Sequence, residues 1–243
     1  IYVTTPGDAG WTYAHDQGRK AVAQKFESTV ETKYLENVPE DPAKVAEAID
    51  ALVKEGCKII FTTSFGFMDG TVAAAKKYPD VKFEHCSGYK RESNLATYFA
   101  REYQARYLTG IVAGKMVPAG AKLGYVAAMG IPEVVRGINA YTLGVRSVNP
   151  TATVHVEFTS FWYDVPAETA AAKKLLDAGA ELMAQHQDST ATIEQAKARG
   201  KYAIGYDTDM SSFAPDTVLT SAIFNWGPYY ISRVEAVLDD KWE

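Results

Sequence analysis

The side chains that could do chemistry in this sequence gather in short loops, each following a strand-like run. In chain order the loops read TPGDAGW, TTSFGFMD, HCSGYKRES, AAMGIPE, SFWYD, HQDST and YDTDMS. Each loop carries polar groups, several carry an aromatic ring, and small residues leave the backbone accessible. Carboxylates recur at Asp8, Asp164, Asp188, Asp207 and Asp209. About half of such loop aspartates are expected to serve only as helix caps.

These loops contain no catalytic constellation. His186, Asp188 and Ser189 supply the residue types of a catalytic triad, but they lie too close together in one loop for its geometry, and there is no nucleophile elbow. The sequence also has no phosphate-binding loop and no dinucleotide fingerprint. His85, His155 and His186 lack the spacing of metal ligands. Aromatic and acidic loops without catalytic machinery favour a binding protein.

Composition excludes several other classes of function. The 243 residues suffice for one large domain or two small ones, and 47% hydrophobic residues allow an ordinary core. A formal net charge of −5 argues against nucleic acid as the main partner. No apolar run approaches the ~20 residues of a membrane span. Cys57 and Cys86 are interpreted as small buried residues and form no metal or redox motif.

Strand-like and helix-like runs alternate along the whole chain. Strands are expected at 1–5, 29–38, 58–63, 81–88, 121–128, 152–160, 181–186, 202–209 and 217–225. Helices are expected at 13–26, 41–56, 69–79, 95–117, 132–150, 164–180, 190–200 and 226–240. The helix at 41–56 has the clearest signals, with Asp41 as N-cap, Pro42 at the first position and Gly56 as its stop. The alternation predicts an α/β fold of right-handed βαβ units in doubly wound sheets. Ligands of such sheets meet the loops after the strand ends.

Several stretches in this order resemble one family. They read GDAGWTYAHDQGRKAV, IIFTTSFGFMD, YLTGIVAGKM, IPEVVRGINAYTLGVRSVNP, FWYDVPAETAAAKKLLDAGAELMAQ, YAIGYDTDM and VLTSAIFNWG. The chain resembles the basic-membrane-protein (BMP) family of substrate-binding proteins for ABC transporters, which includes bacterial purine nucleoside receptors. The resemblance covers nearly the whole chain.

The resemblance implies a type I periplasmic-binding fold, with two α/β lobes joined by three crossings and ligand in the cleft between them. Crossings are expected near residues 90–95 and 217–222, with the third beyond Glu243. The lobes would comprise residues 1–92 plus 222–243 and residues 93–221. A leader and a C-terminal piece are expected outside this chain. Binding would favour a closed form, which a membrane permease then recognises.

The resemblance also implies a site for a purine. Trp11 and Trp162 would cover the two faces of the base, and Asp8 would accept hydrogen bonds from its edge. As an alternative, Trp11 would be a core aromatic under its loop. The full set of expected ligand contacts is Asp8, Trp11, Phe65, Gly88, Trp162, Asp164, Asp188, Asp207 and Asn225.

Two departures from the family pattern favour a free base over a nucleoside. Nucleoside-binding members typically have a Gly-rich loop where HQDST stands and a ribose-contacting Lys where Phe224 stands. Asp207 matches the ribose-binding Asp, but its partners have changed. The ribose pocket is therefore expected to be partly filled, and adenine is the first choice of ligand.

The expected partners are a small purine ligand and an ABC permease, with no nucleic acid, cofactor or metal. The protein is expected to be a monomer, periplasmic or lipid-anchored at the outer face of the cytoplasmic membrane, and not an enzyme. Two alternatives stay open at this point. One is a hydrolase that acts on nucleosides through the acidic loops, and the other is the ligand-sensing domain of a regulator.

Overall fold

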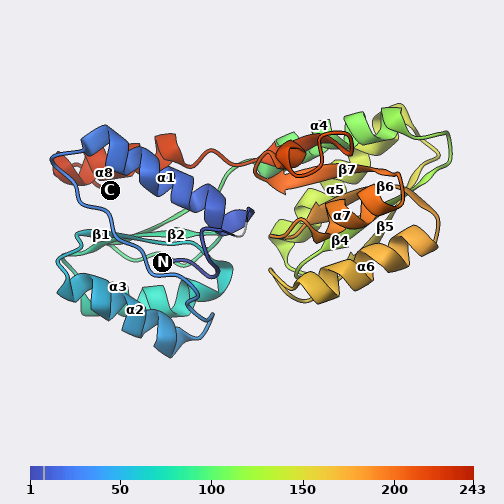
Figure 1. Cartoon of the computed structure of the whole chain (residues 1–243). Helices are drawn as coiled ribbons and strands as arrows, with labels where there is room; N and C mark the ends of the chain where they lie inside the picture. The colour runs from blue at the N-terminus through green and yellow to red at the C-terminus, as the bar shows by residue number, and fades with distance from the viewer. Residues whose placement is uncertain (8) are drawn as a thin grey trace. The chain divides into compact units, whose positions relative to one another are not determined.

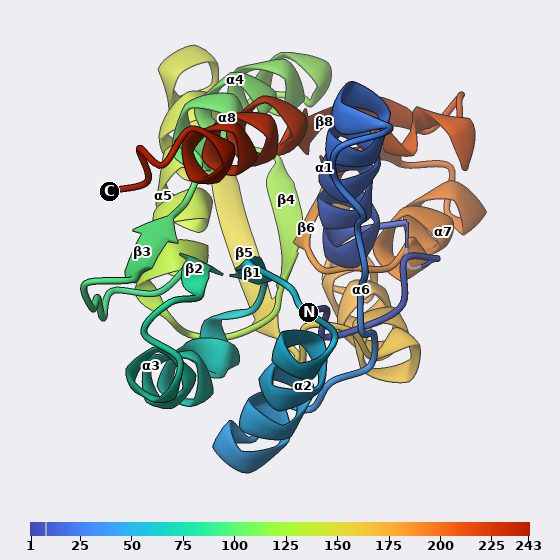
Figure 2. The same cartoon turned by 90° about the vertical axis from the view of Figure 1, so that its left-hand side faces the viewer.

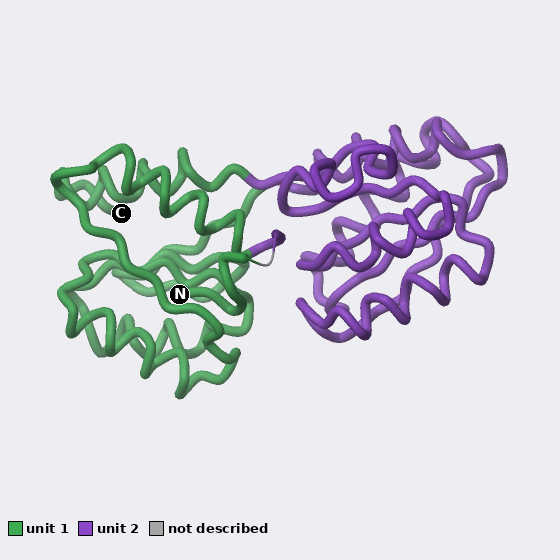
Figure 3. Tube along the Cα trace, viewed as in Figure 1, with its two compact units in different colours: residues 1–7, 12–100, 225–243 green, residues 8–11, 101–224 purple. Residues whose placement is uncertain are grey.

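The computed structural model describes residues 1–7 and 9–243, and these form two compact units. The first unit comprises residues 1–7, 12–100 and 225–243, and the second comprises residues 9–11 and 101–224 (Figure 3). Beyond residues 9–11, the chain passes from the first unit to the second after residue 100 and returns after residue 224. Both passages lie a few residues beyond the positions expected from the sequence.

The first unit is a parallel sheet covered by helices on both faces. Its strand order is β1 (Ile59–Thr62), β2 (Lys82–Cys86) and β3 (Leu95–Tyr98). Helices α1 (Trp11–Phe26) and α8 (Gly227–Leu238) cover one face (Figures 1 and 2). Trp11, the first residue of α1, is assigned to the second unit. Helices α2 (Pro42–Lys54) and α3 (Met68–Lys77) cover the other. A 3-10 turn, η1 (Phe65–Phe67), links β1 to α3.

Helix α2 forms where its end signals predict it. The Asp41 carboxylate accepts hydrogen bonds at 3.0 Å from the backbone N–H groups of Ala43 and Lys44. Pro42 occupies the first turn, where its missing N–H costs nothing. Gly56 follows the helix with a φ of 88°, a left-handed conformation that glycine adopts without strain.

The two strands expected at 1–5 and 29–38 are extended segments rather than regular strands. The Ile1 ammonium donates to the Phe61 carbonyl at 2.8 Å, and Tyr2 N–H donates to the Leu35 carbonyl at 2.8 Å. Residues 1–4 therefore lie between β1 and residues 35–38. The pairing is irregular, because both Val38 N–H and Asn37 N–H bond back to residues 2 and 4, so neither segment qualifies as a strand.

The expectation of one long helix at 95–117 is wrong. Residues 95–98 form β3, which pairs in parallel with β2, and only Glu102–Met116 form a helix, α4. Asn94 fixes the approach of β3, because its side-chain amide donates to the carbonyls of Ala75, Tyr78 and Val81 at 2.9–3.0 Å. The spacing of Leu95 and Tyr98 fits a helix and a strand equally well, so tertiary pairing decided the outcome.

The second unit is a five-stranded parallel sheet with a hydrophobic core on each face. Its order is β5 (Thr153–Phe158), β4 (Lys122–Ala127), β6 (Ala180–His186), β7 (Tyr202–Asp207) and β8 (Val218–Ile223). One core packs the sheet against α4 and α5 (Pro132–Val148), and the other against α6 (Val165–Asp177) and α7 (Ala191–Ala198). Two parallel sheets flanked by helices confirm the expected fold class.

Candidate functional site

Five aromatic side chains of the second unit form a continuous row near the C-terminal ends of its strands. The row, called here the aromatic row, consists of Trp11, Phe224, Tyr206, His186 and Trp162. Trp11 comes from the first loop, and the other four stand at or just after the ends of β8, β7, β6 and β5. Ligands of open parallel sheets are bound at this edge.

Two of the four contacts between successive rings of the row are edge to face, and the other two are tilted. The Trp11 and Phe224 centroids are 5.3 Å apart with an interplanar angle of 88°, and those of Phe224 and Tyr206 are 5.7 Å apart at 70°. Tyr206 and His186 lie 4.3 Å apart, and His186 and Trp162 lie 6.3 Å apart. These are favourable aromatic geometries. The two tryptophans expected to hold the ligand thus stand at the two ends of one packed row.

The end residues of the row differ in their surroundings. Trp11 is 8% exposed, and among the described residues it belongs to none of the three hydrophobic core clusters. Trp162 is half-buried and partly packs against the core beneath α4 and α5. Its neighbours Phe161 and Tyr163 are 52% and 44% exposed. The loop after β5 therefore presents several rings to solvent.

His186 is a buried, neutral member of the row. Its Nε2 lies 3.1 Å from the Tyr206 hydroxyl, and the residue is 2% exposed. Burial lowers the pKa of His186 well below its usual value, and the positive charges of Arg106 and Arg136 lower it further. The sequence showed only that His186 lacks the geometry of a triad member and the spacing of a metal ligand, and no spacing rule reveals its pairing with Tyr206.

Arg106 of α4 packs against the Tyr206 ring of the row. Its guanidinium carbon is 3.8 Å from the centroid of the Tyr206 ring and 5.6 Å from that of Tyr125. Its Nη1 donates to the carbonyl of Gln185 at 2.8 Å, and its Nε is 3.5 Å from Glu102 Oε2. Burial opposes the charge of Arg106, but the nearby tyrosines and carboxylates raise its pKa overall. In the sequence, the only feature that could have drawn attention to Arg106 is its position as a cation on the buried face of a helix.

The aspartates expected at the site have different surroundings. Asp207 ends β7, is fully buried and has a φ of 66°, an uncommon backbone conformation for a residue other than glycine. Asp188 is 4% exposed, and its backbone N–H donates to the Trp162 carbonyl at 3.2 Å. Asp164 is the N-cap of α6, because its carboxylate accepts from Ala167 N–H at 2.8 Å. A capping role accounts for Asp164 locally, as expected for part of this set.

Hydrogen bonds hold the loops around the row in place. Gln187 Nε2 donates to Thr159 Oγ1 at 2.7 Å, and the Ser189 hydroxyl donates to the buried carboxylate of Glu168. The Thr208 hydroxyl donates to the Ala9 carbonyl at 2.5 Å. A Cβ on Gly10 would lie 2.4 Å from the Asp188 carbonyl oxygen, so the first loop packs against backbone there. Ala9 and Gly10 are therefore held against the loops that follow β7 and β6.

The remaining expected contacts lie elsewhere in the chain. Phe65 begins η1 in the first unit and is half-buried. Gly88 follows β2 in the same unit and packs against the His85 ring, which a Cβ would approach to 2.1 Å. Asn225 is exposed at the return to the first unit. Asp8 lies outside the described residues. Its role stays a prediction.

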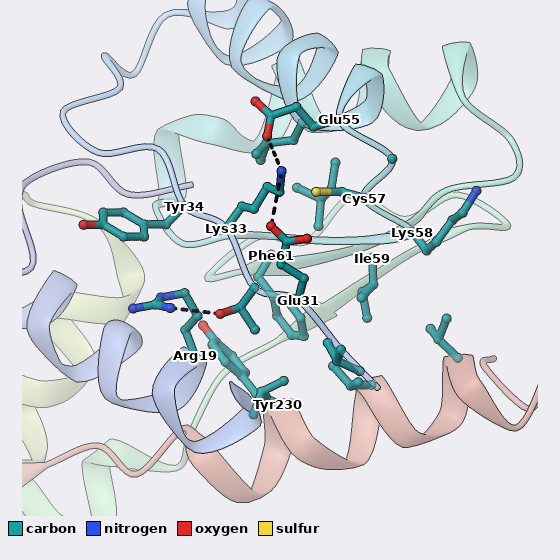
Figure 4. Close-up of a pocket in the computed structure, with 18 of the residues that line it drawn as sticks. Arg19, Glu31, Lys33, Tyr34, Glu55, Cys57, Lys58, Ile59, Phe61 and Tyr230 are labelled. Atoms are coloured by element: carbon teal, nitrogen blue, oxygen red, sulfur yellow. Dashed lines mark hydrogen bonds and ion pairs between the residues drawn. The ribbon is translucent and has the colours of Figure 1, made fainter. Parts of the chain in front are cut away.

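A pocket of about 570 Å³ lies in the first unit, away from these residues. Its walls come from residues 29–34, residues 55–61 and the apolar side of α8 (Figure 4). Lys33 bridges Glu31 and Glu55 at its rim, and Arg19 donates to Thr32. None of the expected ligand residues that the structure describes lines this pocket.

Three further features of the described part of the chain concern metal ions, disulfides and membrane spans. Within residues 1–7 and 9–243, no three His, Cys, Asp or Glu side chains come together in a way that could hold a metal ion. Cys57 and Cys86 are free thiols. The described helices include none with the length and apolar character needed to cross a membrane.

Comparisons with known proteins agree with this architecture. The model of the Bmp family, described as PnrA-like ABC transporter substrate-binding proteins, matches residues 1–243. A purine-binding protein of Brucella abortus is 50% identical over 243 residues, which are all of this chain and 69% of that protein. A candidate ABC transporter glucose-binding protein of Haloferax volcanii is 41% identical over 244 residues, all of this chain and 61% of that protein. The chain thus spans about two thirds of the length of these relatives.

Solved structures agree on the fold. An ABC transporter solute-binding protein from Aeropyrum pernix superposes with a TM-score of 0.84 at 22% identity, over 99% of this chain and 70% of that one. The family consists of binding proteins and not of enzymes, which removes the hydrolase alternative. The chain belongs to the Bmp family of PnrA-like substrate-binding proteins of ABC transporters.

Proposed function

We propose that this protein delivers a purine to an ABC importer and that it binds a free base such as adenine in preference to a nucleoside. The observation that carries the proposal is the aromatic row, which has an indole at each end. The purine-binding name of the relative at 50% identity supports the ligand class. The glucose-binding name of the relative at 41% identity points to a different class.

In this proposal Trp11 and Trp162 stack on the two faces of the base. This requires the row to curve around the base, because Phe224, Tyr206 and His186 lie between the two indoles along it. Stacking on an aromatic side chain contributes ~1–3 kcal/mol per base in proteins that bind nucleic acids. Stacking uses the area of a base but does not identify its edge. Asp8 supplies that recognition by accepting hydrogen bonds from an exocyclic amine or ring N–H, because a carboxylate only accepts. Asp188 and Asp207 provide further polar contacts from the ends of β6 and β7.

The proposed preference for a free base rests on the small space that the residues beside the row leave for a ribose. Phe224 is 8% exposed and packs edge-on between Trp11 and Tyr206, where related nucleoside receptors have a lysine. Gln187 and Ser189 are tied to Thr159 and Glu168, where those receptors have glycines. A hydroxyl buried without a partner costs ~1–3 kcal/mol. Two unmatched ribose hydroxyls would therefore reverse a preference for the nucleoside.

The transport role supplies the remaining partners. The protein would work outside the cytoplasmic membrane, as a monomer, and pass its ligand to a membrane permease. Periplasmic location and lipid anchoring both fit this role.

Calorimetry with adenine, adenosine, guanine, guanosine and glucose in one buffer tests the proposal. We expect adenine or a related free base to bind more tightly than its nucleoside. Tighter binding of adenosine than of adenine would overturn the size argument and leave the purine class intact. Binding of glucose without any purine would overturn the ligand class itself.

A further inference from the structure

Arg106 is a buried cation that the proposed ligand contacts leave unexplained. Its side chain is fully buried, with Glu102 as its close counter-charge, 3.5 Å from Nε. Nη1 makes the hydrogen bond to Gln185, whereas Nε and Nη2 make none within the described residues. Apolar side chains of similar volume often replace buried ion pairs without loss of stability. A purely structural role is therefore a weak reason for an arginine here.

Two contacts of Arg106 lead to the inner members of the aromatic row. The guanidinium stacks on the Tyr206 ring at 3.8 Å, and Nη1 binds the backbone of Gln185, the residue before His186. Stacking of a desolvated guanidinium on an aromatic ring is among the stronger cation–π contacts. Arg106 therefore touches both strand ends that carry the Tyr206–His186 pair.

We propose that Arg106 is a positioning residue of the ligand site, which holds Tyr206 and His186 in the orientation that the two end tryptophans require. It does not touch the ligand. Tyr206 contacts two other members of the row, because its hydroxyl lies within hydrogen-bond distance of His186 and its ring packs edge to face with Phe224. The orientation of Tyr206 therefore affects the positions of both. The inference rests on the proposed function, because binding at the row gives this orientation its purpose.

The charges around His186 favour the neutral imidazole that pairs with Tyr206. Arg106 on α4 and Arg136 on α5 both oppose a positive charge on the ring. Glu133 of α5 is the nearby carboxylate, with its Oε1 3.9 Å from His186 Nε2, and Tyr206 of β7 supplies the hydroxyl. Loss of the Arg106 charge removes one of the two cations that keep the imidazole neutral.

Two variants separate positioning from folding. Arg106→Lys keeps the charge but loses the planar stack and the fixed donor geometry. Arg106→Met combined with Glu102→Gln removes both charges, so that no carboxylate is left buried without its partner. Arg199→Lys is the matched control, because Arg199 belongs to the same unit and pairs with Asp177 at the surface. Each variant is measured for adenine affinity, thermal unfolding and the ¹⁵N NMR signals of the His186 imidazole.

For Arg106→Lys we expect adenine affinity to fall about tenfold or more while the protein stays folded at the assay temperature. The His186 signals should show a changed tautomer balance, and in the double variant the ring should begin to titrate at higher pH. The control should match the wild type in all three measurements.

A lower unfolding temperature with unchanged affinity and unchanged His186 signals would show a structural role only and overturn the inference. If the wild type binds no adenine, the proposed function fails, and the NMR signals alone decide the case. Altered His186 signals in Arg106→Lys would then support the positioning role, and unaltered signals would refute it.

Discussion

At the scale of single residues, Trp11 gives the most direct test of the site. Trp11→Ala removes one stacking face, and we expect adenine binding to weaken by about 1–3 kcal/mol. Tyr13→Ala is the control, since Tyr13 lies on the same helix and is 40% exposed. Calorimetry at one temperature compares the two. An affinity equal to the wild type would mean that Trp11 serves only to pack against Phe224.

A single substitution distinguishes a ligand-binding role of Asp8 from a helix-capping role. Asp8→Asn keeps the size of the side chain and much of its capping ability, but it replaces one acceptor oxygen with a donor amide. We therefore expect a clear loss of adenine affinity with little change in the melting temperature. The opposite pattern, a lower melting temperature with full affinity, would assign Asp8 to capping the start of α1.

At the scale of elements, Asp164 tests how the start of α6 is used. Its carboxylate accepts from Ala167 N–H, and Glu168, one residue beyond the usual capping-box position, accepts in turn from Asp164 N–H at 3.0 Å. Asp164→Ala should lower the free energy of unfolding by about 1 kcal/mol. Urea denaturation measures this loss. If adenine affinity falls by more than stability accounts for, Asp164 also contacts the ligand.

The contact between α4 and α5 depends on glycines. A Cβ on Gly144 would lie 2.0 Å from the Tyr107 carbonyl oxygen, and one on Gly110 would lie 2.1 Å from that of Tyr141. Both neighbours are backbone atoms, so the helices would have to separate. Gly144→Ala should cost about 1–3 kcal/mol of stability by overpacking. Gly130→Ala is the control, because nothing lies within 4 Å of its Cβ position. Equal unfolding free energies for both variants would contradict the close approach.

At the scale of the whole molecule, buried histidines make stability depend on pH. Burial lowers the pKa of His85 to about 4 and those of His15 and His186 well below their usual value. The unfolded chain therefore binds more protons than the folded one below pH ~6.5, and stability falls as the pH falls. At pH 5 the burial of His85 should cost about 2 kcal/mol relative to pH 7, because its pKa of about 4 lies below that pH while the unfolded value lies near 6.5.

Two buried carboxyl groups act in the opposite direction. Burial raises the pKa values of Glu102 and Glu168, so their contribution to stability is present at low pH and is lost as the pH rises through those values. Urea denaturation at intervals from pH 7 to pH 5 measures the sum. We expect His85→Gln to reduce the pH dependence and His155→Gln, a change at an exposed position, to leave it unchanged. A pH-independent wild type would refute the burial argument.

Most local elements and the family membership could be predicted from the sequence. Asp41, Pro42 and Gly56 marked α2 because caps and stops act through neighbouring backbone groups. The apolar run at 58–63 marked β1, since a parallel strand covered on both faces need not alternate. Trp11 and Trp162 were predicted as site residues from the family resemblance, and that role stays a prediction.

Only the tertiary structure decided which residues meet. β3 was hidden inside a helical pattern because the spacing of its apolar residues suits both elements, and pairing with β2 selected the strand. His186, Tyr206 and Arg106 come from three separate elements, so no sequence spacing could reveal that they stack together. Arg106 of α4 lies close to His186, the last residue of β6, only in the folded protein. The reason is that the packed sheet brings the ends of β6 and β7 against α4.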